Sequence, residues 1–251
     1  MTTSEQSAPH GLFVYAVVQA DHDLPDGVTG VDGSPLALVP YGGLGAVVGT
    51  VALDRPAGRR ADLTAYSAVM EALLPGRAVA PISFGTVMPD EQTVIAELLA
   101  PREAHLSRLL QELDGRVQYN VRASYVEEAV LAEIVESDPE IRHLRERTRD
   151  LPEDARMGDR IRLGELVSQA WEHRARLDAD QLLAQVVPIV SAHAVRREPG
   201  PQAALDAALL VDRARSQELE DQLESLAEQA DGRMQLTLLG PLVPYDFVGS
   251  A

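Results

Sequence analysis

The sequence predicts an α+β protein of two domains, in which antiparallel sheets pack against helices. Two patterns favour this class. Short runs rich in β-branched and aromatic residues, such as residues 11–19, are typical of strands, whereas apolar residues at helical spacing, as in residues 63–74, are typical of amphipathic helices. The chain of 251 residues suits one large or two small domains, and its hydrophobic content of 45% supports an ordinary core.

The order of the predicted elements divides the chain into four parts. Residues 1–10 are expected to form a disordered tail. Residues 11–126 read as strand, hairpin, helix, strand, helix, strand, which predicts a ferredoxin-like domain with helices on one face of an antiparallel sheet. Residues 127–239 predict a second α+β domain, with leading helices and a small antiparallel sheet. Residues 240–251 predict a C-terminal tail that docks on the body of the protein.

Composition excludes several classes of protein. The net charge of −17 is expected to repel nucleic acids and anionic membrane surfaces. The chain has no cysteine, which excludes disulfides, thiolate metal ligands and a cysteine nucleophile. No segment approaches the ~18 apolar residues of a membrane span. We therefore expect a soluble, cytoplasmic protein with no nucleic-acid partner and no membrane span.

The first half begins with a strand over residues 11–19. Residues 36–40 and 46–53 predict two further strands, joined by a glycine-rich turn at residues 41–45. A helix with a buried stripe follows, in which Asp62 serves as the cap and the Pro-Gly pair at residues 75–76 ends the helix. The apolar residues of this stripe are Leu63, Tyr66, Val69, Met70, Leu73 and Leu74.

Residues 77–90 carry an almost uncharged apolar run between two helical segments. Its apolar members are Val79, Ile82, Phe84 and Val87. Such a run predicts a strand buried on both faces, in the middle of the first sheet. Asp90 is then expected to cap a helix that breaks or kinks at Pro101, and residues 117–126 predict the last strand of this domain.

The second half opens with two predicted helices, over residues 127–136 and from the Asp-Pro-Glu sequence at 138–140. Residues 149–158 predict an exposed linker. A long helix begins near residue 159, and its predicted buried positions are Ile161, Leu166, Val167, Ala170 and Trp171. The pattern allows this helix to continue through Leu182, Leu183 and Val186. The remaining elements are strands at 192–197 and 204–211 across a turn at 198–201, a helix at 213–230, a strand at 234–239 and an irregular tail at 240–248.

The candidate residues for a catalytic, cofactor or metal site do not have the spacing or the sequence setting that such sites require. The glycines at 43, 45 and 49 precede a strand rather than the helix that a dinucleotide loop requires, so they predict a hairpin turn. The six histidines show no i, i+4 pairing, which argues against a metal site. Ser83 lacks the glycine setting of an exposed nucleophile. We predict no catalytic residue, no metal, no cofactor and no enzymatic activity.

Two segments are candidates for binding a partner. Seven arginines between Arg142 and Arg162 are interleaved with five acidic residues, which favours a salt-bridged helical surface and leaves an acidic protein partner as the alternative. In the C-terminal tail, two prolines favour an extended path and apolar side chains supply anchors. The tail is expected to dock on the protein itself; the alternative is that it, or the groove it covers, receives an apolar partner segment.

The motifs together resemble the gas vesicle protein family GvpF/GvpL over nearly the whole chain. The most specific segments are PISFGT at residues 81–86 and GPLVPYDFV at residues 240–248. The family motif residues carried by this chain are Pro81, Phe84, Gly85, Thr86, Gly240, Pro241, Pro244, Tyr245 and Phe247. The chain departs from the usual family pattern at Tyr66-Ser67, at Ile82-Ser83 and at Val243, and the resemblance does not separate F-type from L-type members.

The resemblance implies an accessory protein of gas vesicle formation and not an enzyme. It implies that the chain binds the very apolar shell protein GvpA, and other accessory proteins as further candidates, acts early in assembly, prevents premature aggregation and remains a minor vesicle component. The predicted contact residues are Arg160, Arg162, Glu165 and Trp171, with Tyr245 and Phe247 from the tail. The alternative function is a ligand-sensing regulatory module that binds a small molecule in a cleft between the domains.

Overall fold

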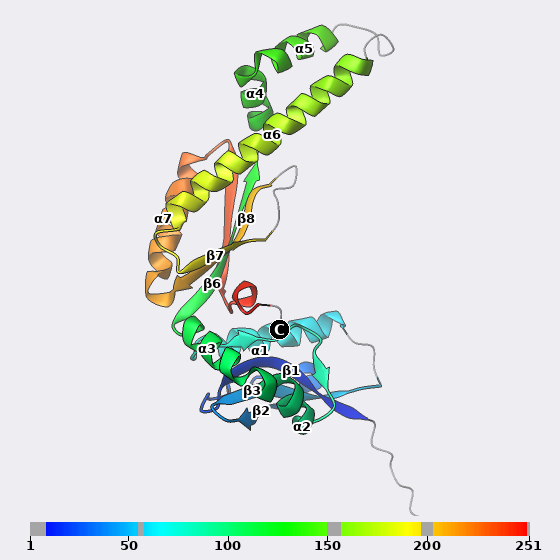
Figure 1. The fold of residues 1–251 in the computed structure, drawn as a ribbon, viewed down its shortest axis with the longest axis vertical. Helices are drawn as coiled ribbons and strands as arrows, with labels where there is room; N and C mark the ends of the chain where they lie inside the picture. The colour runs from blue at the N-terminus through cyan, green and yellow to red at the C-terminus, as the bar shows by residue number, and fades with distance from the viewer. Residues whose placement is uncertain (1–8, 55–57, 150–156, 197–202, 250–251) are drawn as a thin grey trace, which may run out of the picture. The chain divides into compact units, whose positions relative to one another are not determined.

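The chain forms two compact α+β units in a computed structural model that describes residues 9–54, 58–149, 157–196 and 203–249 (Figure 1). The first unit contains Met1–Gln118 and Pro241–Ala251, and the second contains Tyr119–Gly240. Each unit has its own sheet, so the predicted two-domain α+β class is confirmed. Compared with the predicted division, the first unit ends eight residues earlier (126 − 118) and includes the C-terminal segment. Residues 1–8, most of the predicted linker and the predicted turn at 198–201 lie outside the described residues.

The sheet of the first unit is centred on β1 (His10–Gln19). β1 pairs antiparallel with β3 (Leu44–Ala52), which forms the predicted hairpin with β2 (Leu36–Tyr41). Gly42 lies in the turn of this hairpin with a φ of +57°, a conformation that glycine adopts without strain. On its other side β1 pairs with two short strands, β4 (Ala80–Pro81) and β5 (Val87–Met88).

The prediction of a central strand over residues 77–90 is therefore wrong. Only β4 and β5 of this segment are extended and paired, and they lie at the edge of the sheet. Between them the chain turns, because Gly85 has a φ of +88° and the Thr86 N–H donates to the Ser83 carbonyl at 3.2 Å. Apolar content without regular alternation did not distinguish a strand from an apolar turn.

Helices cover both faces of the first sheet, whereas the sequence predicted them on one. Helix α1 (Arg60–Leu73) packs on the face that presents Tyr15 and Val47. Successive strand residues point to opposite faces, so the buried Val48 of β3 faces away from α1. That face is covered by η2 (Val94–Leu99), a π-helical segment, and by α3 (Glu103–Leu113), which contact β3.

The predicted helix ends of the first unit are largely confirmed. The Arg59 N–H donates to the Asp62 carboxylate at 3.1 Å, so Asp62 caps α1 from its third helical position. The Asp90 carboxylate accepts from the Thr93 N–H at 2.7 Å at the start of α2 (Glu91–Thr93). The predicted break at Pro101 is the 3₁₀ turn η3 (Ala100–Arg102). Leu63, expected on the buried stripe of α1, is 50% exposed.

The second unit is built on a four-stranded sheet of order β7-β8-β6-β9. The predicted strand at 117–126 forms, as β6 (Arg116–Tyr125), but it joins this sheet and not the first one. The other strands follow the prediction: β7 (Ala192–Val195), β8 (Ala203–Asp212) and β9 (Met234–Leu242). The helices of this unit are α4 (Glu127–Ser137), α5 (Pro139–Arg149), α6 (Met157–Val186) and α7 (Ser216–Gln229), and the short turn η5 (Arg213–Arg215) precedes α7. The first unit contains two further short turns, η1 (Val31–Gly33) and η6 (Tyr245–Phe247).

Helix α6 is longer than the sheet beside it. Its 30 residues span about 45 Å, whereas a ten-residue strand spans about 33 Å. The excess length packs against α4 and α5 (Figure 1). The predicted buried stripe is therefore wrong in its N-terminal part, where Ile161 is 56% exposed. The buried residues lie later, at Ala175, Asp178, Leu182 and Val186. Within the described ranges, no helix combines the length and the apolar character needed to cross a membrane.

The C-terminal segment continues β9 and then enters the core of the first unit. β9 includes Gly240 and Pro241, which the sequence assigned to an irregular tail. Val243 is only 2% exposed and belongs to the same apolar cluster as Phe13, Tyr15 and Met70. The chain end is thus a structural part of the first unit, in agreement with the expectation that the tail docks on the protein itself.

Replacing Val243 by alanine is expected to destabilise the first unit. The loss of two buried methyl groups and the cavity that remains cost about 2 kcal/mol. Hydrogen exchange followed by mass spectrometry should show amides of β1 and α1 exchanging about 30-fold faster. Amides of β8 in the second unit serve as the internal control. Unchanged exchange in β1 would contradict the placement of Val243 in this core.

Candidate interaction surface

The motif at residues 81–86 forms a turn that is held to β1 by backbone hydrogen bonds. The Ile82 N–H donates to the Tyr15 carbonyl at 2.9 Å, and the Val14 N–H donates to the Thr86 carbonyl at 2.9 Å. Pro81 is buried at the end of β4. Between these anchors the turn raises Phe84 to the surface, where its side chain is 37% exposed.

The second motif is anchored in the first unit by Gln118. Its side-chain amide donates to the Asp246 carboxylate at 2.6 Å, and its amide oxygen accepts from the Asp246 N–H at 3.0 Å. Gln118 is fully buried whereas Asp246 is exposed, so both hydrogen bonds are partly buried. Pro244 is also buried, whereas Tyr245 in η6 is 40% exposed. Phe247 is half-buried, and Gly240 and Pro241 lie exposed in β9.

Tyr66 of α1 joins the two motifs. Its hydroxyl donates to the Ile82 carbonyl at 2.7 Å. The centroid of its ring lies 5.4 Å from the centroid of the Phe84 ring, in an edge-to-face arrangement, and 6.4 Å from that of the Tyr245 ring. Burial raises the pKa of the Tyr66 hydroxyl, and the neighbouring Tyr245 raises it further, so the group remains a proton donor at neutral pH.

Phe13 and Tyr15 of β1 complete an aromatic cluster around Tyr66. The centroid of the Phe13 ring lies 5.0 Å from that of Tyr15 and 5.9 Å from that of Phe84. The rings of Tyr15 and Tyr66 are stacked, with their centroids 6.1 Å apart. These distances are those of favourable aromatic pairs. The Tyr15 hydroxyl accepts from the Val31 N–H at 2.7 Å, which satisfies it inside the core.

Exposed apolar side chains continue from this cluster along β5 and β3. Val87 pairs with Phe13 and is 38% exposed, and Leu53, after β3, is 48% exposed. A Cβ atom placed on Gly11 would lie 3.0 Å from both Leu53 and Val87, so these two side chains flank Gly11. We call Leu53, Phe84, Val87 and Tyr245 the apolar surface. Its members are large apolar side chains that are partly exposed, a pattern typical of contact sites for apolar partners.

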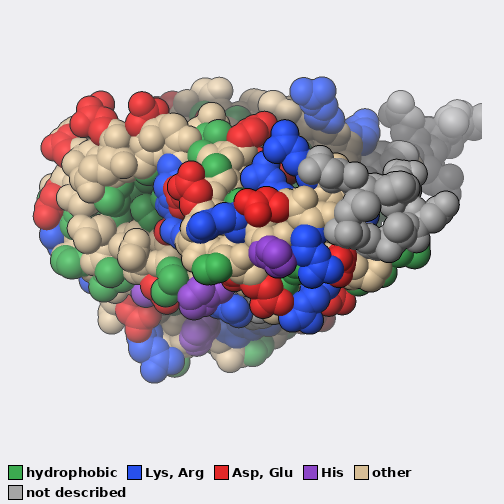
Figure 2. Space-filling view, turned by 90° about the horizontal axis from the view of Figure 1, so that it is seen from above, with side chains coloured by type: hydrophobic (Ala, Val, Ile, Leu, Met, Phe, Trp, Pro, Cys, Tyr) green, Lys and Arg blue, Asp and Glu red, His purple; other side chains and the backbone are tan. Residues whose placement is uncertain are grey.

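The predicted contact residues on α6 belong to the other unit. Arg162 pairs with Glu140 of α5 at 2.6 Å, and Arg147 of α5 pairs with Asp159 at 2.7 Å. Arg160 and Glu165 are exposed. Figure 2, seen from the α4–α5 end, shows basic and acidic side chains side by side on this face. The described part of the predicted salt-bridged helical surface therefore forms, whereas residues 150–156 lie outside the described residues.

Comparison with known proteins relates the whole chain to gas vesicle proteins. The family model described as "Gas vesicle synthesis protein GvpL/GvpF" matches residues 11–249. This chain belongs to the GvpL/GvpF family. Its relatives include gas vesicle protein F of Streptomyces sp. (strain CB03234), 33% identical over 94% of this chain and 98% of the relative. Gas vesicle protein L of the same strain is 32% identical over 95% of this chain and 93% of the relative.

Solved structures of GvpF proteins share the fold. The crystal structure of GvpF from Anabaena sp. PCC7120 matches with a TM-score of 0.82 and 20% identity, over 96% of this chain and 99% of that one. GvpF from Microcystis aeruginosa matches with a TM-score of 0.75 and 21% identity, over 95% and 98%. At these identities the likeness supports the fold. The chain is about equally similar to the F-type and the L-type relative, so sequence identity does not assign it to either type.

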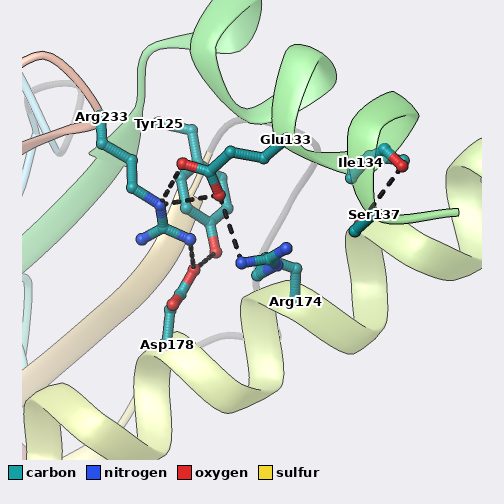
Figure 3. A network of polar contacts seen from close by, with 7 residues as sticks. All are labelled: Tyr125, Glu133, Ile134, Ser137, Arg174, Asp178 and Arg233. Atoms are coloured by element: carbon teal, nitrogen blue, oxygen red, sulfur yellow. Dashed lines mark hydrogen bonds and ion pairs between the residues drawn. The ribbon is translucent and has the colours of Figure 1, made fainter.

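A partly buried polar network in the second unit of this GvpL/GvpF protein was not predicted from the sequence. The Tyr125 hydroxyl donates to the Asp178 carboxylate at 2.5 Å, and Arg233 donates to Asp178 at 2.7 Å and to Glu133 at 2.8 Å (Figure 3). Arg174 pairs with the same Glu133 at 3.2 Å. The signal in the sequence is Asp178 itself, a carboxylate on the buried stripe of α6.

The network fixes α6 against α4 and β6, and Trp171 packs beside it. The Trp171 ring meets the Tyr125 ring edge to face at 5.3 Å. Burial raises the pKa of Tyr125, and its bond to Asp178 raises it further. Burial alone would lower the pKa of Arg233, but its bonds to Asp178 and Glu133 outweigh this effect and raise it. Trp171, predicted as a contact residue, is thus half-buried in a structural contact.

Replacing Asp178 by alanine is expected to destabilise the second unit by about 3 kcal/mol, because Tyr125 and Arg233 lose a buried partner. Trp171 is the only tryptophan of the chain, so its fluorescence during urea unfolding reports this unit. The matched control is Asp180→Ala, an exposed position on the same helix, expected to change stability by less than about 0.5 kcal/mol. Equal effects of the two substitutions would refute the role of the network.

Proposed function

We propose that this GvpL/GvpF protein binds the apolar shell protein GvpA and assists gas vesicle assembly by keeping the shell protein dispersed until it is incorporated. The observation that supports this most directly is the apolar surface, because both sequence motifs contribute an exposed aromatic side chain to it, Phe84 and Tyr245. An apolar shell subunit aggregates unless its apolar faces are covered. Large aromatic side chains supply such contact area at a small entropic cost.

The charge of the protein supports the second part of this role. With 39 acidic against 22 basic residues, the net charge is −17. A complex that carries this charge repels other complexes of the same kind, which opposes precipitation. The protein acts in this proposal without catalysis, in the cytoplasm and as a minor component of the growing vesicle, where other accessory proteins are further partners.

Substitutions that make the apolar surface more polar should weaken binding without unfolding the chain. The variant carries Leu53→Ser and Val87→Ser, whose side chains are about half and a third exposed. On co-expression with GvpA, we expect co-purification to fall roughly tenfold or more, with a matching loss of soluble GvpA, because each truncated contact costs about 1 kcal/mol or more.

Two matched variants locate the contact. Leu177→Ser, at an exposed apolar residue of α6, should bind GvpA as the unsubstituted protein does. Ile161→Ser tests the α6 surface predicted from the sequence, close to Arg160 and Arg162. If only Ile161→Ser lost binding, the GvpA contact would lie on α6 and not on the apolar surface. Absence of co-purification with the unsubstituted protein, together with unchanged GvpA solubility, would overturn the proposed function.

A further inference from the structure

The second unit has a groove between α7 and β9. Its volume is about 200 Å³. The wall formed by α7 presents Leu223 and Ala227 together with two carboxylates, Glu220 and Glu224. The floor is Val121 of β6, and the opposite wall is the stretch Leu236, Thr237 and Leu238 of β9. The groove is therefore apolar inside and acidic along one rim.

One wall of this groove is the edge strand of a sheet. β9 ends the strand order β7-β8-β6-β9, and in the part of the chain that the structure describes it pairs with β6 alone. An edge strand presents backbone N–H and carbonyl groups that another extended chain can pair with. β9 is nine residues long, and Leu239 on it is 60% exposed. Pro241 near its end has no N–H to donate, which confines such pairing to the part of β9 before it.

The other wall carries uncompensated negative charge. Helix α7 contains five acidic residues and no basic residue. Glu218 pairs with Arg215, and Glu220 accepts a hydrogen bond from the Tyr119 hydroxyl at 2.9 Å. Glu224 is exposed on the rim and has no side-chain partner among the described residues. A chain in the groove therefore meets carboxylates that a basic side chain can neutralise.

We propose that this groove binds an extended segment of a partner protein, which adds to β9 as a further strand. Apolar side chains at alternate positions of that segment enter the groove against Leu223 and Leu236, and an adjacent Arg or Lys pairs with Glu220 and Glu224. A second copy of this chain is a poor occupant, because two-fold pairing of β9 strands would bring the acidic α7 helices toward each other. This site is independent of the apolar surface and lies in the other unit.

The test uses the full chain and a synthetic peptide of about seven residues, matched to the part of β9 before Pro241, with alternating valine and threonine and arginine at both ends. Fluorescence anisotropy measures its affinity, and hydrogen exchange locates the contact. We expect binding that protects the amides of β9, and at least roughly tenfold weaker binding of the same peptide with glutamate in place of arginine. Equal affinity for both peptides, no binding at millimolar concentration, or protection elsewhere would overturn the proposal.

Two charge-reversal variants on α7 provide the matched comparison. Glu224→Arg should weaken binding roughly tenfold, whereas Glu228→Arg, on the same helix but outside the groove lining, should change it less than about threefold. Ala227→Leu fills the groove without changing charge and should also weaken binding. Trp171 fluorescence verifies that each variant is folded. Equal effects of Glu224→Arg and Glu228→Arg, or full binding by Ala227→Leu, would contradict a groove site.

Discussion

The contacts of Tyr66 are the interaction on which the first unit of this gas vesicle protein depends. A single side chain of α1 hydrogen-bonds the backbone at Ile82 and packs against the rings of Phe84 and Tyr245. Segments more than 150 residues apart are thereby brought to one surface (245 − 84). Because the hydroxyl is buried and fully paired, removing it leaves the Ile82 carbonyl without its partner, which is costly in a core.

This arrangement explains why the two motifs are informative together. Each motif has a buried half and an exposed half: Pro81 and Pro244 are buried, whereas Phe84 and Tyr245 reach the surface. The buried halves anchor two short segments that each contain a turn. The exposed halves form an apolar surface that the sheet alone does not provide. In the second unit the network around Asp178 has the corresponding anchoring role for α6.

The sequence was sufficient for most elements because their signals are local. The hairpin glycines, the Asp90 cap and the strand of residues 11–19 depend on neighbours within a few residues. Among the predictions that failed, three depend on features that the local composition does not show. Residues 82–86 form a turn because Gly85 adopts a positive φ, and nothing in their apolar composition reveals it. β6 has the alternation of any half-buried strand, which does not indicate which sheet it joins. Ile161 is exposed because α6 extends past its sheet.

The role of Tyr66 as the joint between the two motifs is tested most directly by hydrogen exchange in the Tyr66→Ala protein. The account predicts that amides at residues 82–87 and at residues 243–248 lose protection together, since both depend on the same side chain. Tyr41→Ala, at a half-buried tyrosine of β2 outside the aromatic cluster, should leave both segments protected. Loss of protection in only one segment, or in neither, would contradict the account.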